Sequence, residues 1–227
     1  MKQQFGIDIS HWQNAIDFAK VKADKTPIDF VYIKASEGSS FNSVHFNAAT
    51  TYASACVKNN IAFGFYHFAR PSLTNAANEA GNFVTTMRKL PGAKILPVLD
   101  LEVNDNKLTR DQMQTWVSDF IKTMSNLGVK KIRLYSYTPF LNDNLPGDHP
   151  FGSLSLWIAA YNPVAPRIPN GWKTFDIWQY TDSGTVDGVP GKVDMNRTGV
   201  NVDLIMGVST GLIAMIVVGL VSLLLLK

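Results

Sequence analysis

Short apolar runs rich in β-branched and aromatic residues alternate along the chain with longer amphipathic segments. The short runs predict strands and the longer segments predict helices. The predicted strands are Phe5–Ile9, Phe30–Ala35, Ala62–His67, Ile95–Leu101, Ile132–Ser136, Leu156–Tyr161 and Phe175–Tyr180. The predicted helices are Ala15–Ala23, Val44–Asn59, Asn75–Leu90 and Arg110–Leu127, the last with Thr109 and Gln112 at its start and Gly128 at its stop.

Alternation of strand and helix is typical of a mostly parallel sheet. Seven or more strands in about 200 residues favour closure into a barrel over an open sheet. Prolines and glycines interrupt the connections after Ser136 and after Tyr161, where regular helices would otherwise follow. We therefore expect an α/β fold in residues 1–200, an irregular (β/α) TIM-like barrel that lacks several late helices.

The chain changes character at its C-terminus, where residues 205–226 include no charged side chain. As a helix, this run would measure ~33 Å, which matches the hydrocarbon thickness of a bilayer. We expect a transmembrane helix at 204–226 that associates the protein with a lipid bilayer, with a buried helix of the soluble domain as the alternative. Flanking charges leave the topology undecided, with Lys192 and Arg197 on one side and Lys227 on the other.

The N-terminus leads directly from Met-Lys-Gln-Gln into a predicted strand, so no N-terminal signal peptide is expected. A chain with a C-terminal span and no signal peptide suits a phage product. Its location would then be the host membrane, as a lysis enzyme, or the virion, as a penetration protein.

Composition narrows the classes of function. The 227 residues are 46% hydrophobic and 17% charged, and the net charge of +3 gives no reason to expect a nucleic-acid partner. The four histidines lack the spacing of a zinc motif, so neither a metal nor a cofactor is expected. The single cysteine, Cys56, cannot form an internal disulfide and falls in a predicted helix, which indicates a buried thiol.

Acidic residues stand beside the ends of several predicted strands. Asp8 lies near the end of the first strand, Glu37 follows the second, Asp100 and Glu102 close the fourth, and Asp194 closes a short apolar stretch near the end of the domain. The strands of a β/α barrel all end at one face, which hosts the active site. We therefore expect these acids to converge, although each alone could be a solvated loop residue or a helix cap.

The spacing of Asp100 and Glu102 predicts a particular chemistry. Side chains two positions apart on a strand point the same way, so these two carboxyls should share one side and Leu99 and Leu101 the other. Like charges close together raise the proton affinity of one of them. The result is a neutral acid beside an ionised partner, as cleavage of a glycosidic bond requires.

Seven sequence motifs occur in an order and spacing that resemble glycoside hydrolase family 25, the Chalaropsis-type lysozymes, over about residues 5–197. They are Gly6-Ile7-Asp8-Ile9-Ser10-His11-Trp12-Gln13, Phe30-Val31-Tyr32-Ile33-Lys34-Ala35-Ser36-Glu37-Gly38, Gly64-Phe65-Tyr66-His67-Phe68-Ala69, Pro97-Val98-Leu99-Asp100-Leu101-Glu102, Leu156-Trp157-Ile158-Ala159-Ala160-Tyr161, Trp178-Gln179-Tyr180 and Val193-Asp194-Met195-Asn196.

The resemblance implies an irregular β/α barrel that hydrolyses the β-1,4 bond between N-acetylmuramic acid and N-acetylglucosamine in peptidoglycan. It implies that Glu102 is the general acid and that Asp100 orients the 2-acetamido group of the substrate, which would attack the anomeric carbon. Asp8 and Asp194 match two further acids of the catalytic pocket. The implied substrate-binding residues are Tyr66, Lys34, Glu37, Trp157, Tyr161 and Gln179, with Lys34 and Glu37 as a supporting pair.

Other functions stay open at this point. A direct double displacement or an inverting water would also use two acids. Chitinase-like barrels also end a strand in Asp-x-Glu, although their motif usually carries further aspartates upstream. A third alternative is a membrane-active phage structural protein whose barrel only binds the cell wall.

Overall fold

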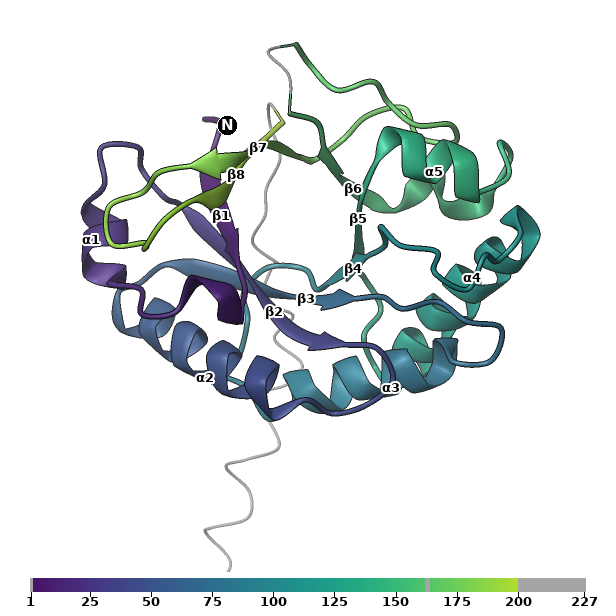
Figure 1. The fold of residues 1–227 in the computed structure, drawn as a ribbon, viewed down its shortest axis with the longest axis horizontal. Coiled ribbons are helices and arrows are strands. Elements are labelled where there is room, and N and C mark those ends of the chain that lie inside the picture. The colour runs from purple at the N-terminus through teal and green to yellow at the C-terminus, as the bar shows by residue number, and fades with distance from the viewer. Residues whose placement is uncertain (1, 162–163, 200–227) are drawn as a thin grey trace, which may run out of the picture.

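A computed structural model describes residues 2–161 and 164–199, and Figure 1 shows them as a barrel of strands with helices outside it. Eight strands close the barrel in sequence order. They are β1 (Phe5–Ile9), β2 (Phe30–Glu37), β3 (Ala62–Phe68), β4 (Val98–Asp100), β5 (Arg133–Tyr137), β6 (Ser155–Ala159), β7 (Ile177–Gly184) and β8 (Val193–Thr198). The helices are α1 (Phe18–Ala23), α2 (Ser43–Lys58), α3 (Ala76–Met87), α4 (Arg110–Asn126) and α5 (Thr138–Asn144), with short 3₁₀ helices η1 (His11–Gln13) and η2 (Pro150–Ser153).

The barrel confirms the predicted α/β architecture and its reduced second half. Strands β1 to β7 pair in parallel, and in the described residues only α5 and η2 interrupt the connections from β5 to β8. Helix α5 was not predicted, because Pro139 suggested a loop. Pro139 lies in the first turn of α5, where a missing N–H breaks no helical hydrogen bond.

Strand β8 was also missed, and it departs from the parallel pattern. It runs antiparallel to both of its neighbours, β7 and β1, and so closes the barrel. Its sequence, Val193-Asp194-Met195-Asn196-Arg197-Thr198, is short and mostly polar, which hides the strand signal. β4 is shorter than predicted: it begins only after Pro97, which has no N–H to donate to a ladder.

Two apolar clusters stabilise the barrel. Outward-facing residues such as Val31 and Phe65 pack against the helices, which Figure 1 shows around the outside of the strands. Inward-facing residues fill the barrel, among them Phe30, Tyr32, Ile95, Val98, Tyr135, Trp157 and Ile177. Gly64 leaves room for this inner cluster, because a Cβ there would come within 2.6 Å of the Tyr32 ring.

A buried arginine closes the end of the barrel opposite the strand C-termini. Arg133 is 2% exposed; its Nε donates to Ser155 Oγ at 2.7 Å, and its Nη1 donates to the Tyr32 hydroxyl. The guanidinium group is therefore satisfied by hydrogen bonds despite its burial. The interior at this end is filled, which leaves the other end of the barrel for a site.

Local sequence signals at α2 and α4 behave as predicted. Thr109 and Gln112 form a capping box at the start of α4, and Gly128 follows its end with a φ of +94°. Cys56 is fully buried in α2, and burial raises the pKa of its thiol to about 12.

The predicted transmembrane helix at 204–226 lies outside the described residues. Within residues 2–161 and 164–199, none of the helices has the length and apolar character needed to cross a bilayer. The division into a domain at 1–200 and a helix at 204–226 therefore stays a prediction.

Candidate active site

The parallel strands end at a cavity of about 240 Å³ at the mouth of the barrel. All four predicted catalytic acids line it, although they come from β1, from the end of β4 and from β8. Five of the six predicted substrate-binding residues line it as well. The full lining consists of Asp8, Ser10, Trp12, Lys34, Tyr66, Phe68, Asp100, Glu102, Tyr135, Trp157, Tyr161, Gln179 and Asp194.

Asp8 and Asp194 lie directly opposite each other on the antiparallel strands β1 and β8. The sequence placed Asp194 at the end of an apolar stretch, and this was wrong: it stands near the beginning of β8. Because β8 runs against the other strands, its beginning lies at the mouth. The result is the predicted convergence, reached by a different path of the chain.

The Asp8–Asp194 pair holds protons at unusually high pH. The two carboxyls hydrogen-bond each other, and burial together with the charge of Asp8 raises the pKa of Asp194 to about 8. Burial also raises the pKa of Asp8, while amide N–H groups of Asn196 and Gln179 oppose that shift by donating to its Oδ2 at 2.8 and 2.9 Å. Asp194 is therefore the member of the pair that keeps the shared proton.

Asp100 and Glu102 occupy the same side of the β4 end, as the alternation predicted, with Leu99 and Leu101 buried on the other side. Burial raises the pKa of Asp100 well above its usual value, and the charge of Glu102 raises it further. Burial and the charge of Asp8 raise the pKa of Glu102, while Lys34 and Arg70 oppose this. A proton is thus retained on this carboxyl pair.

One atom of this pair has an open hydrogen-bonding position. Asp100 is 5% exposed, and no group in residues 2–161 and 164–199 hydrogen-bonds to its buried Oδ1. Buried polar atoms are normally paired, and an exception at a cavity wall indicates a place for a ligand group.

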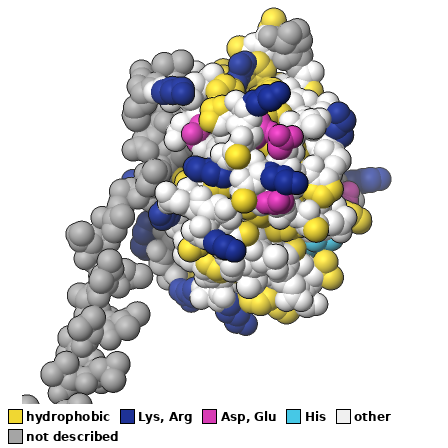
Figure 2. Space-filling view, turned by 90° about the vertical axis from the view of Figure 1, so that its left-hand side faces the viewer, with side chains coloured by type: hydrophobic (Ala, Val, Ile, Leu, Met, Phe, Trp, Pro, Cys, Tyr) yellow, Lys and Arg dark blue, Asp and Glu magenta, His cyan; other side chains and the backbone are white. Residues whose placement is uncertain are grey.

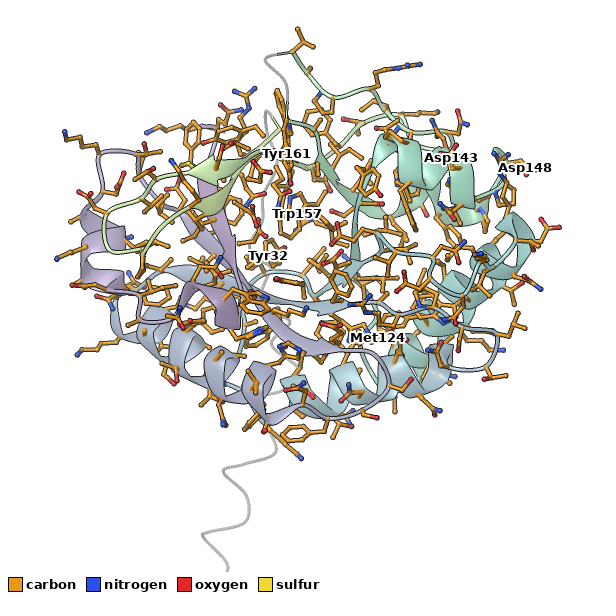
Figure 3. All side chains as sticks on the ribbon, viewed as in Figure 1. Tyr32, Met124, Asp143, Asp148, Trp157 and Tyr161 are labelled. Carbon is orange, nitrogen blue, oxygen red and sulfur yellow. The ribbon has the colours of Figure 1, made fainter. Side chains whose placement is uncertain are left out.

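A chain of aromatic and amide groups fixes the opposite wall. Gln179 Oε1 accepts from the hydroxyls of Tyr135 at 2.8 Å and Tyr161 at 2.6 Å. Trp157 Nε1 donates to Asn196 Oδ1 at 2.8 Å. The Tyr32 and Trp157 rings stack with centroids 4.7 Å apart, and Figure 3 labels them in one row with Tyr161. Gln179 and Asn196 therefore orient Asp8 and are themselves held by aromatic residues.

Lys34 and Glu37 form the predicted pair, with Lys34 Nζ 2.6 Å from Glu37 Oε2. Lys34 lines the cavity beside Tyr66, but Glu37 is not among the lining residues. Glu37 was predicted to bind substrate; in the structure its carboxylate contacts Lys34 and Arg70. Its carboxylate is occupied by these two cations, so we assign it to the support of Lys34.

Sequence reasoning left some residues of the site unassigned. Trp12, 75% exposed at the edge of the cavity, was not among the predicted substrate-binding residues. Tyr135 and Asn196 were also missed. The alternation of inward side chains could have found both, since Tyr135 lies two residues after Arg133 on β5 and Asn196 two residues after Asp194 on β8.

The part of the chain that the structure describes has no cluster of three or more His, Cys, Asp or Glu side chains arranged to hold a metal ion. Charges on the surface are mixed in sign: Figure 2 shows Lys and Arg interspersed with acidic and apolar side chains on one face.

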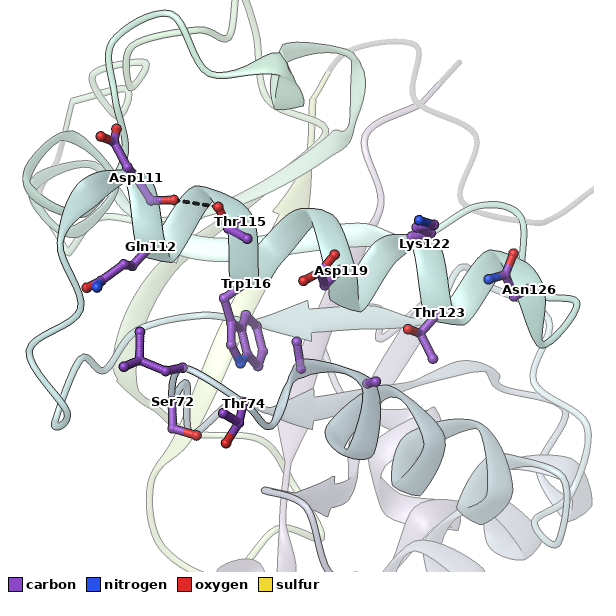
Figure 4. Close-up of a pocket in the computed structure, with 13 residues that line it drawn as sticks. Ser72, Thr74, Asp111, Gln112, Thr115, Trp116, Asp119, Lys122, Thr123 and Asn126 are labelled. Carbon is purple, nitrogen blue, oxygen red and sulfur yellow. Dashed lines mark hydrogen bonds between the residues drawn. The ribbon is translucent and has the colours of Figure 1, made fainter.

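A larger groove of about 470 Å³ lies on the outside, between α3 and α4 (Figure 4). Its acids, Asp111 and Asp119, are exposed residues of one helix. They are eight positions apart, about 12 Å along the helix axis at 1.5 Å per residue. Carboxyls so separated and solvated cannot act as an acid pair on one bond.

Comparison with known proteins decides the family. The profile described as Glycosyl hydrolases family 25 matches residues 7–189. The chain belongs to glycosyl hydrolase family 25. This membership confirms the resemblance drawn from the seven sequence motifs and the prediction of a glycoside hydrolase.

Individual proteins similar to this chain support its membership of family 25. "Lysozyme M1" of Streptomyces globisporus is 33% identical over 210 residues, which cover 85% of this chain and 66% of that protein. A bacterial lysozyme from Streptomyces coelicolor has a TM-score of 0.76 at 30% identity, covering 88% of this chain and 93% of that one. A muramidase from Acremonium alcalophilum has a TM-score of 0.73 at 30% identity, with coverages of 86% and 93%.

Proposed function

We propose that this family 25 enzyme is a muramidase that cleaves the β-1,4 bond between N-acetylmuramic acid and N-acetylglucosamine in peptidoglycan. The carrying observation is that acids from β1, β4 and β8 meet in one cavity, where burial raises their pKa values. The similar proteins named lysozyme and muramidase support the choice of bond.

Glu102 is the general acid of the proposed reaction. Its carboxyl lines the cavity, and burial and the charge of Asp8 raise its pKa, so it stays protonated at a pH where an exposed glutamate is ionised. A neutral carboxyl can give its proton to the leaving glycosidic oxygen.

Asp100 receives the 2-acetamido group of the substrate. The open Oδ1 of Asp100 offers an acceptor for the N–H of that group, which would orient the acetamido oxygen towards the anomeric carbon. Such an N–H stabilises the ionised form of Asp100. Substrate binding would thereby leave the proton of the Asp100–Glu102 pair on Glu102, where the leaving oxygen needs it.

The other lining residues bind the substrate and form the walls of the cavity. Asp8 and Asp194, with one shared proton, form a hydrogen-bonding wall of reduced charge beside the reacting sugar. The half-exposed ring of Tyr161 and the indole of Trp12 at the cavity edge provide apolar faces against which sugar rings pack. Tyr66 and Lys34 supply a hydroxyl and an ammonium to the substrate's polar groups.

The test uses purified peptidoglycan and chitin oligomers, with products read by mass spectrometry. We expect soluble fragments with N-acetylmuramic acid at the reducing end, and a loss of activity of roughly 10³-fold in Glu102→Gln, typical for removal of a general acid. N-acetylglucosamine reducing ends, cleaved peptide bonds, or cleavage of chitin in preference to peptidoglycan would contradict the proposal. Circular dichroism must show that Glu102→Gln keeps the wild-type fold.

We also propose that the run of residues 205–226, which is free of charged side chains, attaches the enzyme to a lipid bilayer. The supporting observation is its length and composition alone. Deletion of 204–227 should move the enzyme from the membrane pellet to the supernatant while its cleavage of soluble glycan fragments stays unchanged. Equal partition of both forms into the supernatant would contradict this attachment.

A further inference from the structure

Strand β2 contains a bulge beside the active site. Its register with β3 shifts between Lys34 and Ser36: Lys34 lies opposite Tyr66, Ser36 opposite His67, and Glu37 opposite Phe68. Ala35 is therefore an extra residue, and Ala35 and Ser36 together face one residue of the neighbouring strand. Both point away from the barrel interior, Ala35 into the outer apolar cluster and Ser36 towards His67.

The bulge changes which residues reach the mouth of the barrel. In a regular strand, Lys34 and Ser36 would point inward and Glu37 outward, because side chains alternate. The extra residue reverses the order after Ala35, so Lys34 and Glu37 share the inner side. Their ion pair at 2.6 Å depends on this reversal.

A buried chain of hydrogen bonds holds the bulge from outside the barrel. Ser36 Oγ lies 2.9 Å from His67 Nδ1, and His67 Nε2 lies 2.9 Å from Glu79 Oε2 on α3. His67 and Glu79 are 0% exposed and Ser36 is 2% exposed. A ring protonated at Nε2 fits both bonds, since it donates to the carboxylate and accepts from the hydroxyl. The complete burial leaves no room for a substrate at this Ser–His–Glu chain.

The Glu79 carboxylate also holds Arg70, which is the second cation that contacts Glu37. Glu79 Oε2 accepts from the backbone N–H of Arg70 at 3.0 Å, and the Arg70 side chain reaches back to Glu37 Oε1 at 2.9 Å. The Phe68 ring lies beneath both cations, 4.4 Å from Lys34 Nζ and 4.7 Å from Arg70 Cζ. Glu79 therefore fixes Glu37 from two directions, through the bulge and through Arg70.

We propose that Ser36, His67 and Glu79 are positioning residues for the glycosidase reaction, which lock the β2 bulge so that the Lys34–Glu37 pair stands at the mouth beside the catalytic acids. The inference rests on the proposed function, and it assigns a role to three residues that do not contact the cavity.

The position of the Lys34 ammonium sets the proton affinity of the acids. Its charge opposes the rise in the pKa of Glu102 and of Asp100. Other charged or titratable groups also interact with this pair of acids or with the Lys34–Glu37 pair. They are Asp8, Asp194, Arg70, Tyr66, Tyr135, Tyr137, His11, His45 and His67. If the bulge relaxed, Lys34 would move away and the carboxyl pKa values would rise. The pH profile of catalysis would then move to higher pH.

The experiment measures kcat/KM against pH for the full-length enzyme and its variants. Ser36→Ala removes the hydroxyl and should move the profile upward by about half a pH unit or more, because a nearby charge shifts a buried carboxyl by that order. His67→Phe keeps a planar ring but removes the acceptor for Ser36, and it should move the profile in the same direction. Ser36→Thr keeps a hydroxyl and should retain the wild-type profile.

Two controls separate positioning from loss of stability. His149→Gln alters another buried histidine, whose Nε2 hydrogen-bonds to the Asn170 carbonyl outside the site; it should lower the melting temperature without moving the profile. Lys34→Met removes the ammonium altogether, so its pH profile of kcat/KM gives the largest shift that movement of Lys34 can cause. Addition of Ser36→Ala to Lys34→Met should then produce no further shift, although the melting temperature falls again.

The outcomes are distinct. A Ser36→Ala profile that overlays that of the wild type, in a folded and active variant, would overturn the inference and leave the proposed function intact. A Ser36→Ala shift of equal size in the Lys34→Met background would overturn it as well. Wild-type enzyme that releases no fragments from peptidoglycan would instead contradict the proposed function.

Discussion

The mouth of the barrel and the groove between α3 and α4 both carry carboxyl groups, in different surroundings. The mouth is about half as large, at about 240 Å³ against about 470 Å³. Its acids come from three strands, are at least partly buried and have raised pKa values, whereas those of the groove are exposed along one helix. Burial and convergence, and not the size of a hollow, therefore give carboxyl groups the raised pKa values that acid catalysis needs.

Substitution of one acid in each hollow gives the largest contrast. Asp100→Asn should lower kcat/KM for peptidoglycan by roughly 10²-fold or more, because the amide cannot stabilise charge on the acetamido group. Asp119→Asn, in the groove, should leave kcat/KM unchanged. Similar losses of activity in the two variants, in a turbidity assay at matched protein concentration, would contradict this contrast between mouth and groove.

A smaller effect is expected from the wall that orients Asp8. Gln179→Leu removes the N–H that Asp8 accepts at 2.9 Å and leaves the hydroxyls of Tyr135 and Tyr161 without their acceptor. We expect about a tenfold loss of kcat/KM, in line with one buried hydrogen bond to a charged group. In the groove, Gln112→Leu is the matched change and should have no kinetic effect. Equal KM and kcat in wild type and Gln179→Leu would remove this wall from the mechanism.

The pH dependence of stability tests the burial of the acids at the mouth without an activity assay. Asp194 has a folded pKa of about 8 against a reference value of 3.8. A raised pKa stabilises the fold below the reference value, and this contribution is lost as pH rises through about 8. Relative to wild type, Asp194→Asn should therefore gain melting temperature as pH increases across this window. Melting curves measured by circular dichroism that stay parallel at every pH would count against the raised pKa.

The smallest effect concerns a group that is buried but stands apart from the mouth. Cys56 has no exposed surface, and burial raises the pKa of its thiol to about 12, so a thiolate is scarce at neutral pH. We expect no labelling of the native enzyme by iodoacetamide and full labelling after denaturation. Cys56→Ala should retain wild-type activity, and rapid native labelling would show that α2 opens.

Much of the fold was predictable from the sequence because the early strands and helices have strong, local signals. β1, β2 and β3 are apolar runs, and Thr109 and Gln112 form the capping box that begins α4. β8 was not predictable in this way. Its side chains are polar where they face the cavity, so its pairing with β1 and β7, a long-range contact, decides its structure.

The site was predictable in its acids and less so in its supporting groups. Alternation correctly placed Asp100 and Glu102 together, and strand ends placed Asp8 with them. The β2 bulge could not be read from the sequence, because one extra residue breaks the alternation without a distinctive residue to mark it. The resemblance alone implied Glu37 as a substrate-binding residue paired with Lys34; the structure shows the pair, with the Glu37 carboxylate held by Lys34 and Arg70.

The role of Glu102 as general acid is tested most directly by ¹³C NMR titration of its carboxyl in enzyme labelled at glutamate side chains, with Glu102→Gln to assign the signal. We expect a pKa above the ordinary value of 4.5, since burial and the charge of Asp8 both favour the protonated form. A Glu102 pKa at or below 4.5 in the folded enzyme would contradict it.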